Sequence, residues 1–268
     1  MKAFFIDLDG TLLNDRKQIT PATREALLRV KAAGHEIIIT TGRSYPYVKV
    51  LNEKIDNVCR YTISSTGSII YDLHEQKTLS STPIPDKALN ALFRIKHPDI
   101  AWLLHCAEGL YSTGNIDDQK GTNIPFTEPL DKFIKTKTVG ETTMASYNFD
   151  LIKNVESDVL KIPGIFITHR HRALTDPSAP RNGIAFYDII PTGVSKGTGV
   201  KALRNLLGIP KADCIAIGDD INDLPMFAEC GIKVAANNAV AQIKKIADHI
   251  TTDDNNHDGV AKFLDSFS

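Results

Sequence analysis

Phe4-Phe5-Ile6-Asp7-Leu8-Asp9-Gly10-Thr11, near the start of the 268-residue chain, is an apolar run that ends in two aspartates and a glycine. The run Ala3 to Ile6 predicts a short buried strand, and alternate residues of an extended chain point the same way. Asp7 and Asp9 should therefore converge just beyond the carboxyl end of this strand, where open parallel sheets bind ligands. Gly10 allows a tight departure of the chain. Two converging carboxylates favour a divalent cation between them, and a surface turn rich in Asp and Gly is the alternative interpretation.

Short apolar runs alternate with helix-like segments in the first quarter of the chain and again near its end. Expected strands are Ile37–Thr40, Ile69–Tyr71, Cys214–Ile217 and Ile232–Ala235, and expected helices start at Pro21, Lys196 and Ile221. Thr20 supplies a side-chain cap directly before Pro21, and proline is favoured at the first helical position. Strands that are apolar on both faces and separated by helices indicate an α/β fold with a parallel sheet covered on both sides.

The middle of the chain follows a less regular pattern, from about Pro83 to Tyr187. A helix is expected at Asp86–Lys96, and strands at Ala101–Leu104, Gly109–Tyr111, Val159–Thr168 and Gly183–Ile190. Strands with few helices are typical of an α+β unit. We therefore expect a core formed by residues 1–82 and 188–268, into which an α+β domain of residues 83–187 is inserted.

The bulk composition places few limits on function but disfavours several classes of partner. The net charge is −1 and 24% of the residues are charged, so a nucleic-acid partner is not expected. No stretch approaches the length of a membrane span, and the N-terminus offers no signal peptide. The four cysteines are widely spaced without a C-x-x-C pair, which suits a reducing cytosol and predicts a cytoplasmic protein. The oligomeric state stays open.

Two further segments carry groups suited to phosphate. Ile39-Thr40-Thr41-Gly42-Arg43 places a hydroxyl and backbone amides at the end of a second strand, where they can hold phosphate oxygens. A plain strand-to-helix turn is the alternative. Gly193-Val194-Ser195-Lys196-Gly197 puts a lysine at a helix start, against the helix dipole. This placement indicates that Lys196 pairs with anions, and a solvated lysine is the alternative.

A second acidic cluster follows the expected strand Cys214–Ile217. It consists of Asp219, Asp220, Asn222 and Asp223 in the run Ile217-Gly218-Asp219-Asp220-Ile221-Asn222-Asp223. A well-capped helix start is the alternative interpretation, since Asp and Asn are good caps. One cap requires only one such residue, so four polar residues in five favour a functional site.

These four segments, in this order, resemble the motifs of the haloacid dehalogenase (HAD) superfamily of phosphohydrolases. D-x-D-G-T-L, T-G-R, G-V-S-K-G and G-D-D-I-N-D-L-P-M together are similar to the Cof-type subfamily with a large cap, over roughly residues 1–70 and 188–260. The resemblance implies a Rossmann-like core, with a parallel sheet and helices on both faces, and an inserted α+β cap. It implies an Mg²⁺ cofactor and an aspartyl-phosphate intermediate on Asp7, with Asp9 as general acid/base whose backbone carbonyl reaches the metal.

The resemblance also implies roles for the other matched positions. Thr41 and the amide of Gly42 correspond to the phosphate-binding element, and Lys196 to the lysine that neutralises Asp7 and the phosphoryl group. Asp219 corresponds to a metal carboxylate, so the implied metal ligands are Asp7, Asp9 and Asp219. Asn222 would contact phosphate, while Asp223 would orient Lys196 or a metal-bound water, with Asp220 beside it behind the ligands.

Two places depart from the subfamily pattern or fall outside it. Members often carry Asn-Gly-Ala where this chain has Thr66-Gly67-Ser68, so Thr66 is a candidate for an altered substrate contact. The run His169-Arg170-His171-Arg172 is a basic cluster in the expected cap. It is a candidate contact for an acidic or phosphorylated substrate, and a solvated loop is the alternative.

The leading hypothesis is a magnesium-dependent phosphatase that hydrolyses small phosphorylated metabolites, such as sugar phosphates or cofactor phosphates. A carboxylate attacking an anionic phosphate needs cations that offset the repulsion, which Mg²⁺ and Lys196 would supply. In this superfamily, an aspartate two residues after the nucleophile argues for phosphoryl transfer to water or to an alcohol. In this chain that aspartate is Asp9. A sugar phosphomutase and a non-catalytic binding protein are the alternatives.

Overall fold

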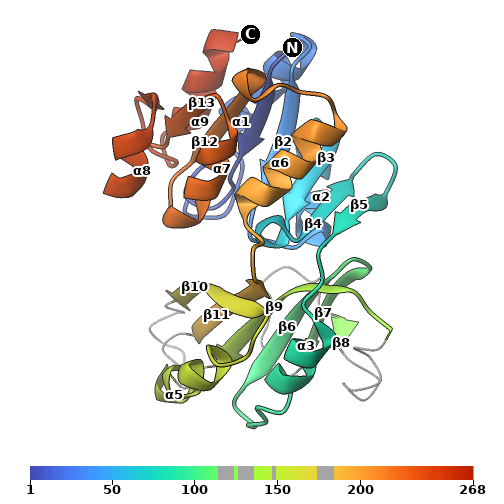
Figure 1. The fold of residues 1–268 in the computed structure, drawn as a ribbon. Helices are drawn as coiled ribbons and strands as arrows, with labels where there is room; N and C mark the ends of the chain where they lie inside the picture. Colours follow the sequence, from blue (N-terminus) through green and yellow to red (C-terminus); the bar gives the residue numbers. More distant parts are fainter. Residues whose placement is uncertain (114–123, 126–135, 147–148, 174–183, 268) are drawn as a thin grey trace. The chain divides into compact units, whose positions relative to one another are not determined.

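Two compact units make up the chain. The computed structural model describes residues 1–113, 124–125, 136–146, 149–173 and 184–267, and for residues 124, 125, 149, 169–173 and 184 it describes the backbone alone. One unit combines Met1–Ser80 with Val194–Ser268, and the other is Ser81–Gly193 (Figure 1). The first unit is therefore assembled from both ends of the chain.

The first unit is built on an eight-stranded sheet with the strand order β14-β13-β12-β1-β2-β3-β4-β5. Its strands are β1 (Ala3–Ile6), β2 (Glu36–Thr40), β3 (Tyr61–Ser64), β4 (Ile69–Asp72), β5 (Lys77–Ser81), β12 (Cys214–Gly218), β13 (Ile232–Ala235) and β14 (His249–Ile250). The pairs from β14 through β12, β1 and β2 to β3 are all parallel, and β4 runs antiparallel to β3. β1 lies between β2 and β12, so the ends of these three strands are neighbours.

Helices cover both faces of this sheet. They are α1 (Pro21–Ala32), α2 (Tyr45–Glu53), α6 (Lys196–Leu206), α7 (Leu224–Glu229), α8 (Ala241–Ile246) and α9 (Gly259–Leu264), with 3₁₀ turns η1 (Ser65–Gly67), η2 (Lys211–Asp213), η3 (Ile221–Asp223) and η4 (Asp265–Phe267). The expected start of α1 is confirmed, because the Thr20 side chain accepts a hydrogen bond from the Thr23 amide directly before Pro21. The expected helix from Ile221 to Glu229 instead divides into η3 and α7.

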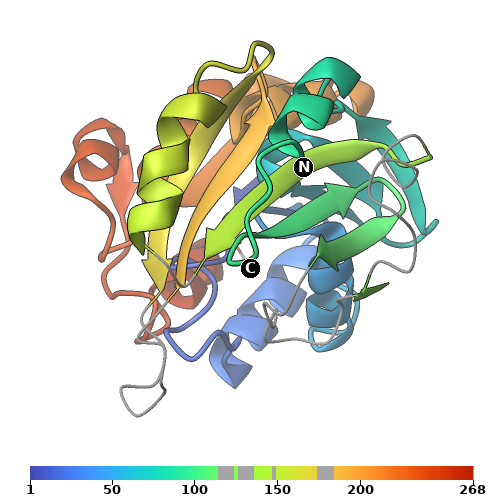
Figure 2. The ribbon, with the colours of Figure 1, turned by 90° about the horizontal axis from the view of Figure 1, so that it is seen from below.

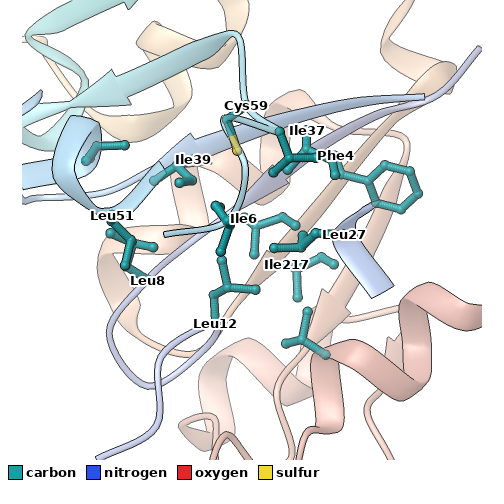
Figure 3. Packing of buried hydrophobic residues seen from close by; sticks show 14 of the residues in the cluster. Phe4, Ile6, Leu8, Leu12, Leu27, Ile37, Ile39, Leu51, Cys59 and Ile217 are labelled. Carbon is teal, nitrogen blue, oxygen red and sulfur yellow. The ribbon is translucent and has the colours of Figure 1, made fainter. Parts of the chain in front are cut away.

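Alternating residues of β1 enter two separate hydrophobic clusters. Phe4 and Ile6 are fully buried against α1, α2 and α9, and Figure 3 shows them packed with Leu27, Ile39 and Ile217. Phe5 is fully buried on the opposite face, in a cluster formed with α6, α7 and α8. A strand buried on both faces must be apolar at every position, which explains the unbroken run before the first aspartate. The expected parallel sheet with helices on both faces is confirmed.

The second unit is a six-stranded sheet with the order β10-β11-β9-β6-β7-β8. Its strands are β6 (Ala101–Cys106), β7 (Gly109–Thr113), β8 (Ile124–Pro125), β9 (Val139–Ser146), β10 (Ile165–Ala173) and β11 (Ile184–Pro191), and its helices are α3 (Asp86–Leu92) and α5 (Phe149–Val159). All pairs are antiparallel except β7 with β8. Both helices lie on the same face of the sheet (Figure 2), where they share one buried cluster with Trp102, Leu104 and Met144. This unit has the expected α+β character.

Three features of this unit differ from the expectations. The expected strand Val159–Thr168 begins only at Ile165, because Val159 is the last residue of helix α5. The helix itself was missed, although the spacing of Leu151, Ile152, Val155 and Val159 gives one apolar stripe. Strand β9 was also missed, since it is composed largely of Gly, Glu, Thr and Ser and lacks an apolar run.

Within the described ranges, none of the helices has the length and apolar character required to cross a membrane. All four cysteines are buried and none is in a disulfide.

Candidate active site

The nucleophile candidate Asp7 lies one residue past β1, at the centre of the parallel sheet. Its amide donates to the Ile217 carbonyl at 3.0 Å, so the ladder with β12 extends to this residue. The residue is only 5% exposed. Lys196, the first residue of α6, donates from Nζ to Asp7 Oδ1 at 2.6 Å. The helix start that carries this lysine is fixed by a reciprocal capping box between Ser195 and Thr198.

The same ammonium group of Lys196 also donates to Asp223 Oδ1 at 2.6 Å. The other carboxylate oxygen of Asp223 accepts from the amides of Asp219 at 2.9 Å and Asp220 at 3.2 Å. Asp223 is fully buried, so both of its oxygens are occupied by groups that hold the lysine and the loop after β12. The Asp220 side chain accepts from the Ile221 amide and caps η3, and Asn222 Oδ1 lies 3.5 Å from Lys196 Nζ.

Asp219 is held by the loop that follows the first aspartates. Thr11 Oγ1 donates to Asp219 Oδ1 at 2.9 Å. A Cβ atom at Gly10 would overlap the Asp219 carboxylate, and Gly10 has φ +81°. This position therefore needs glycine both for its backbone conformation and for the close approach of Asp219. Asp7, Asp219 and Asp223 bring ligand oxygens within 4.8 Å of one another, the one group of three metal-binding side chains in the described residues.

The charges in this group do not balance. Burial raises the pKa of Asp7 well above its ordinary value, against the opposing attraction of Lys196. Burial and then the neighbouring Asp223 raise the pKa of Asp219 to about 7. Burial alone would lower the pKa of Lys196, but the carboxylates of Asp223 and Asp7 outweigh it and raise that pKa. The Lys196 ammonium group is the one cation that contacts this group of three carboxylates in the described residues, and it pairs with Asp7 and Asp223. Excess negative charge is therefore concentrated at the strand ends.

The donor set fits a hard divalent cation. Among the described residues, no hydrogen bond occupies Asp7 Oδ2 or Asp219 Oδ2, whereas both oxygens of Asp223 are in use. Magnesium prefers carboxylate oxygens and retains several water ligands, so two carboxylates suffice for it. The residues present therefore fit such an ion through Asp7 and Asp219, with Asp223 behind them as the partner of Lys196.

Asp9 is directed to a different set of partners. Its two oxygens accept from Arg43 Nε at 2.6 Å and Nη2 at 2.8 Å, and Lys17 Nζ lies 2.8 Å from Oδ1. Arg43 rests on the Tyr47 ring, 4.1 Å from its centroid. Burial would raise the pKa of Asp9, but the Arg43 hydrogen bonds and charge, followed by those of Lys17, lower it strongly. Asp9 is thus held as a carboxylate in this conformation.

Arg43 and Lys17 were not singled out by the sequence analysis. Arg43 had a usable signal, because it is the last residue of the T-G-R run that was assigned to phosphate binding. Lys17 offers none, since a lysine in a polar loop is ordinarily solvated.

Thr41 lies at the end of β2, next to a 3₁₀ turn of unusual conformation. Its hydroxyl oxygen accepts from the Arg43 amide at 3.1 Å, which leaves the hydroxyl hydrogen available to a ligand. Its carbonyl accepts from the Thr66 amide at 3.1 Å. A Cβ at Gly42 would touch Thr66 Oγ1 at 3.4 Å, so Thr66 lies directly against the Thr41–Gly42 segment. The basic run of residues 169–172 belongs to β10, and its side chains lie outside the description.

The turn formed by Ser65, Thr66 and Gly67 has three successive positive φ angles, of 51°, 53° and 100°. A β-branched residue in this region is strained, and the cost of a non-glycine residue there is about 1–3 kcal/mol. Asn adopts the region more readily. Thr66→Asn is expected to raise the free energy of unfolding by about 1 kcal/mol, measured by denaturant or thermal unfolding.

The matched control is Thr66→Val, which removes the hydroxyl but keeps the β-branched shape and the strain. It should give no stabilisation. An equal gain in both variants would show that the backbone conformation is not its source.

Known proteins resemble this chain over nearly its whole length. Residues 4–264 match the family described as haloacid dehalogenase-like hydrolase. The putative phosphatase YxeH of Bacillus subtilis is 30% identical over 97% of this chain and 96% of its own length. The 5-amino-6-(5-phospho-D-ribitylamino)uracil phosphatase YwtE of the same organism is 29% identical over 99% and 97%.

A solved structure has the same fold over the whole chain. A haloacid dehalogenase-like hydrolase from Bacteroides thetaiotaomicron superposes with a TM-score of 0.80 at 24% identity, covering 100% of this chain and 99% of its own. The chain belongs to the haloacid dehalogenase-like hydrolase family. It is a phosphatase, an enzyme that hydrolyses phosphate esters.

Proposed function

We propose that the protein is a magnesium-dependent phosphatase that hydrolyses small phosphorylated metabolites through an aspartyl-phosphate on Asp7. The observation that carries this proposal is the buried Lys196 ammonium group. It lies 2.6 Å from both Asp7 and Asp223, at the carboxyl end of the central strand. A lysine in this position lowers the repulsion between a carboxylate nucleophile and an anionic phosphate ester.

In the first step, Asp7 attacks phosphorus and the bond to the leaving alkoxide breaks. Lys196 stays beside the reacting carboxylate and stabilises charge on the phosphoryl oxygens. The Thr41 hydroxyl, the Gly42 amide and Asn222 are the proposed donors to those oxygens. Magnesium held by Asp7 and Asp219, and by the Asp9 carbonyl, would neutralise charge on the phosphoryl group.

In the second step, Asp9 takes a proton from water, which attacks the phosphorus of the aspartyl-phosphate. The carboxylate form that Arg43 and Lys17 maintain is the form this step requires. In the first step Asp9 must instead supply a proton to the leaving alkoxide. The proton that Asp9 takes from water in the second step restores the acid form for the first step of the next turnover, so Asp9 has to be released from its hydrogen bonds to Arg43 during the cycle.

Two observations support small phosphate esters as the substrate class: the presence of the second unit and the substrate named for one relative. We assign unit Ser81–Gly193 the role of a cap that selects the leaving group and excludes water, so small esters are favoured over phosphoproteins. YwtE, whose name specifies a phosphorylated ribitylamino compound, is consistent with sugar-like or cofactor-like leaving groups. Thr66 and residues 169–172 are the candidate contacts for specificity.

A panel of phosphorylated metabolites tests the proposal directly. Purified protein should release phosphate from sugar phosphates or cofactor phosphates in the presence of Mg²⁺, and addition of EDTA should stop the release. A hexose 1-phosphate in the panel separates the phosphatase from a phosphomutase: isomer formed with little free phosphate would favour the mutase. Absence of turnover across the panel would contradict the proposal.

Magnesium should also stabilise the protein without substrate. A ligand that binds only the folded state at 100 times its Kd adds about 2.7 kcal/mol, so excess Mg²⁺ should raise the Tm. Asp219→Asn removes one charged ligand and should abolish most of this increase. Asp220→Asn keeps a good cap at the neighbouring position and should retain it. The same Mg²⁺-dependent increase in both variants would rule out Asp219 as a ligand.

A further inference from the structure

Two asparagines far from the four motifs form a hydrogen-bonded chain to the loop that follows Asp9. Asn238, in the turn after β13, donates from Nδ2 to the Gly10 carbonyl at 2.7 Å. Its side-chain oxygen accepts from the Asn255 amide at 3.1 Å. Asn255 is 8% exposed, and its Nδ2 donates to the Leu13 carbonyl at 3.0 Å and to Asp15 Oδ1 at 3.1 Å. The loop from Gly10 to Asp15 is thus held at three points.

The turn that carries Asn238 also holds the backbone of Asp219. The Val240 amide donates to the Asp219 carbonyl at 2.9 Å, and the Ala236 amide donates to the Gly218 carbonyl at 3.0 Å. One short turn therefore makes hydrogen bonds to both segments. Its Val240 amide binds the Asp219 carbonyl, and its Asn238 side chain binds the Gly10 carbonyl. The two points it connects belong to the two segments that supply Asp7 and Asp219.

The segment that carries Gly10 and Thr11 is in close contact with Asp219, so neither can shift without moving the other. The Asp219 carboxylate packs against the backbone of Gly10 too closely for a Cβ, and its Oδ1 accepts from Thr11. A shift of the Gly10 carbonyl would move Thr11 and release this carboxylate. The three carboxylates of the site repel one another, so their spacing must be imposed by bonds outside the group.

We propose that Asn238 and Asn255 are positioning residues that fix the distance between the Asp7–Thr11 segment and Asp219, and thereby set the affinity of the site for a divalent cation. The inference rests on the proposed magnesium site. Residues that orient metal ligands from outside typically change metal affinity by about 10–100-fold when removed. A residue that only fastened a surface loop would change stability and leave metal affinity unaltered.

Asn237 provides the matched control, because it is the adjacent residue and makes bonds of the same kind elsewhere. Its Nδ2 donates to the carbonyls of Thr251 at 3.1 Å and Thr252 at 3.3 Å. Asn237→Ala therefore removes side-chain to backbone bonds from the same turn without touching Gly10. Both asparagines are exposed, so burial does not distinguish the two substitutions.

The experiment measures thermal unfolding of the full chain as a function of Mg²⁺, without substrate. Asn238→Ala should need about tenfold more Mg²⁺ than wild type for the same increase in Tm above its own value in EDTA, whereas Asn237→Ala should match wild type. In EDTA, the two variants should have similar Tm values. Asn255→Ser, which cannot reach both Leu13 and Asp15, should also need more Mg²⁺ than wild type for the same increase in Tm.

If Asn238→Ala and Asn237→Ala need the same Mg²⁺ concentration for a given increase in Tm, the inference is overturned. A lower Tm of Asn238→Ala in EDTA with an unchanged Mg²⁺ requirement would overturn it as well. If Asn238→Ala does not fold, Asn238→Ser takes its place and the same criteria apply. A wild-type protein whose Tm does not respond to Mg²⁺ would refute the proposed metal site itself, and with it this inference. Phosphate release at saturating Mg²⁺ should be recovered in Asn238→Ala.

Discussion

Asp7→Asn is expected to lower kcat for phosphate release by at least about 10⁴-fold, the order seen when a catalytic nucleophile is removed. An amide of the same shape cannot form the aspartyl-phosphate. The fold should be kept, because the substitution removes a negative charge from a site where burial and neighbouring carboxylates already raise the pKa of Asp7. Stability should therefore stay level or increase, as measured by thermal unfolding in EDTA.

The control for this substitution is Asp248→Asn, an exposed aspartate paired with Lys233, which should retain full turnover. Acid quenching with substrate labelled on the phosphoryl group should leave label on the wild-type protein and none on Asp7→Asn. Turnover of Asp7→Asn within tenfold of wild type would exclude Asp7 as the nucleophile.

Lys196→Met is expected to lower the free energy of unfolding by about 3–5 kcal/mol, the usual cost of removing one partner of a buried ion pair. Methionine fills a similar volume, so the loss comes from charge rather than from a cavity. Asp7 and Asp223 would remain buried without their shared cation. Activity should be lost in the same variant, since the proposed nucleophile loses the ammonium group that offsets its repulsion from the phosphate. Denaturant unfolding and phosphate release measure the two effects.

Lys201→Met is the matched control, because Lys201 lies on the same helix and is exposed. It should change stability by less than about 0.5 kcal/mol. Adding Asp223→Asn to Lys196→Met should recover part of the lost stability, because it removes one of the two orphaned charges. A Lys196→Met protein as stable as Lys201→Met would show that the ion pair does not contribute to the fold.

The sequence predicted the core because the physical causes there are local. A strand buried on both faces must be apolar throughout, so β1 was delimited without error, and the polar residues that follow it had to lie at the sheet edge. Lys196 was singled out because a cation at a helix start is unfavourable unless anions offset it. The structure places Asp7 and Asp223 against it.

What the sequence did not predict depends on contacts between distant residues. The partners of Asp9 lie in other segments, and Arg43 is 34 positions away. The left-handed conformation of Thr66 has no local signal, since threonine is disfavoured there. Asn238 and Asn255 are separated from Gly10 by more than 200 residues, and a single asparagine in a turn is ordinary.

The second unit was predicted less well for a related reason. All eight residues of β9 are buried, yet five of them are Gly, Glu, Thr or Ser, so the strand has no apolar run from which its burial could be predicted. The specificity residues proposed for this unit, from His169 to Arg172, remain a prediction, because their side chains lie outside the described part of the structure.

The position of β1 between β2 and β12 has a consequence for synthesis of the chain. Asp7 leaves the ribosome 189 residues before Lys196, and Asp219 and Asp223 follow later still. At about 5–20 residues per second, the nascent chain carries one unpaired edge of β1 for about 10–40 s. An apolar strand with a free edge is a template for aggregation. Strand β1, which carries the proposed nucleophile, is thus open to aggregation until β12 has been synthesised and pairs with it.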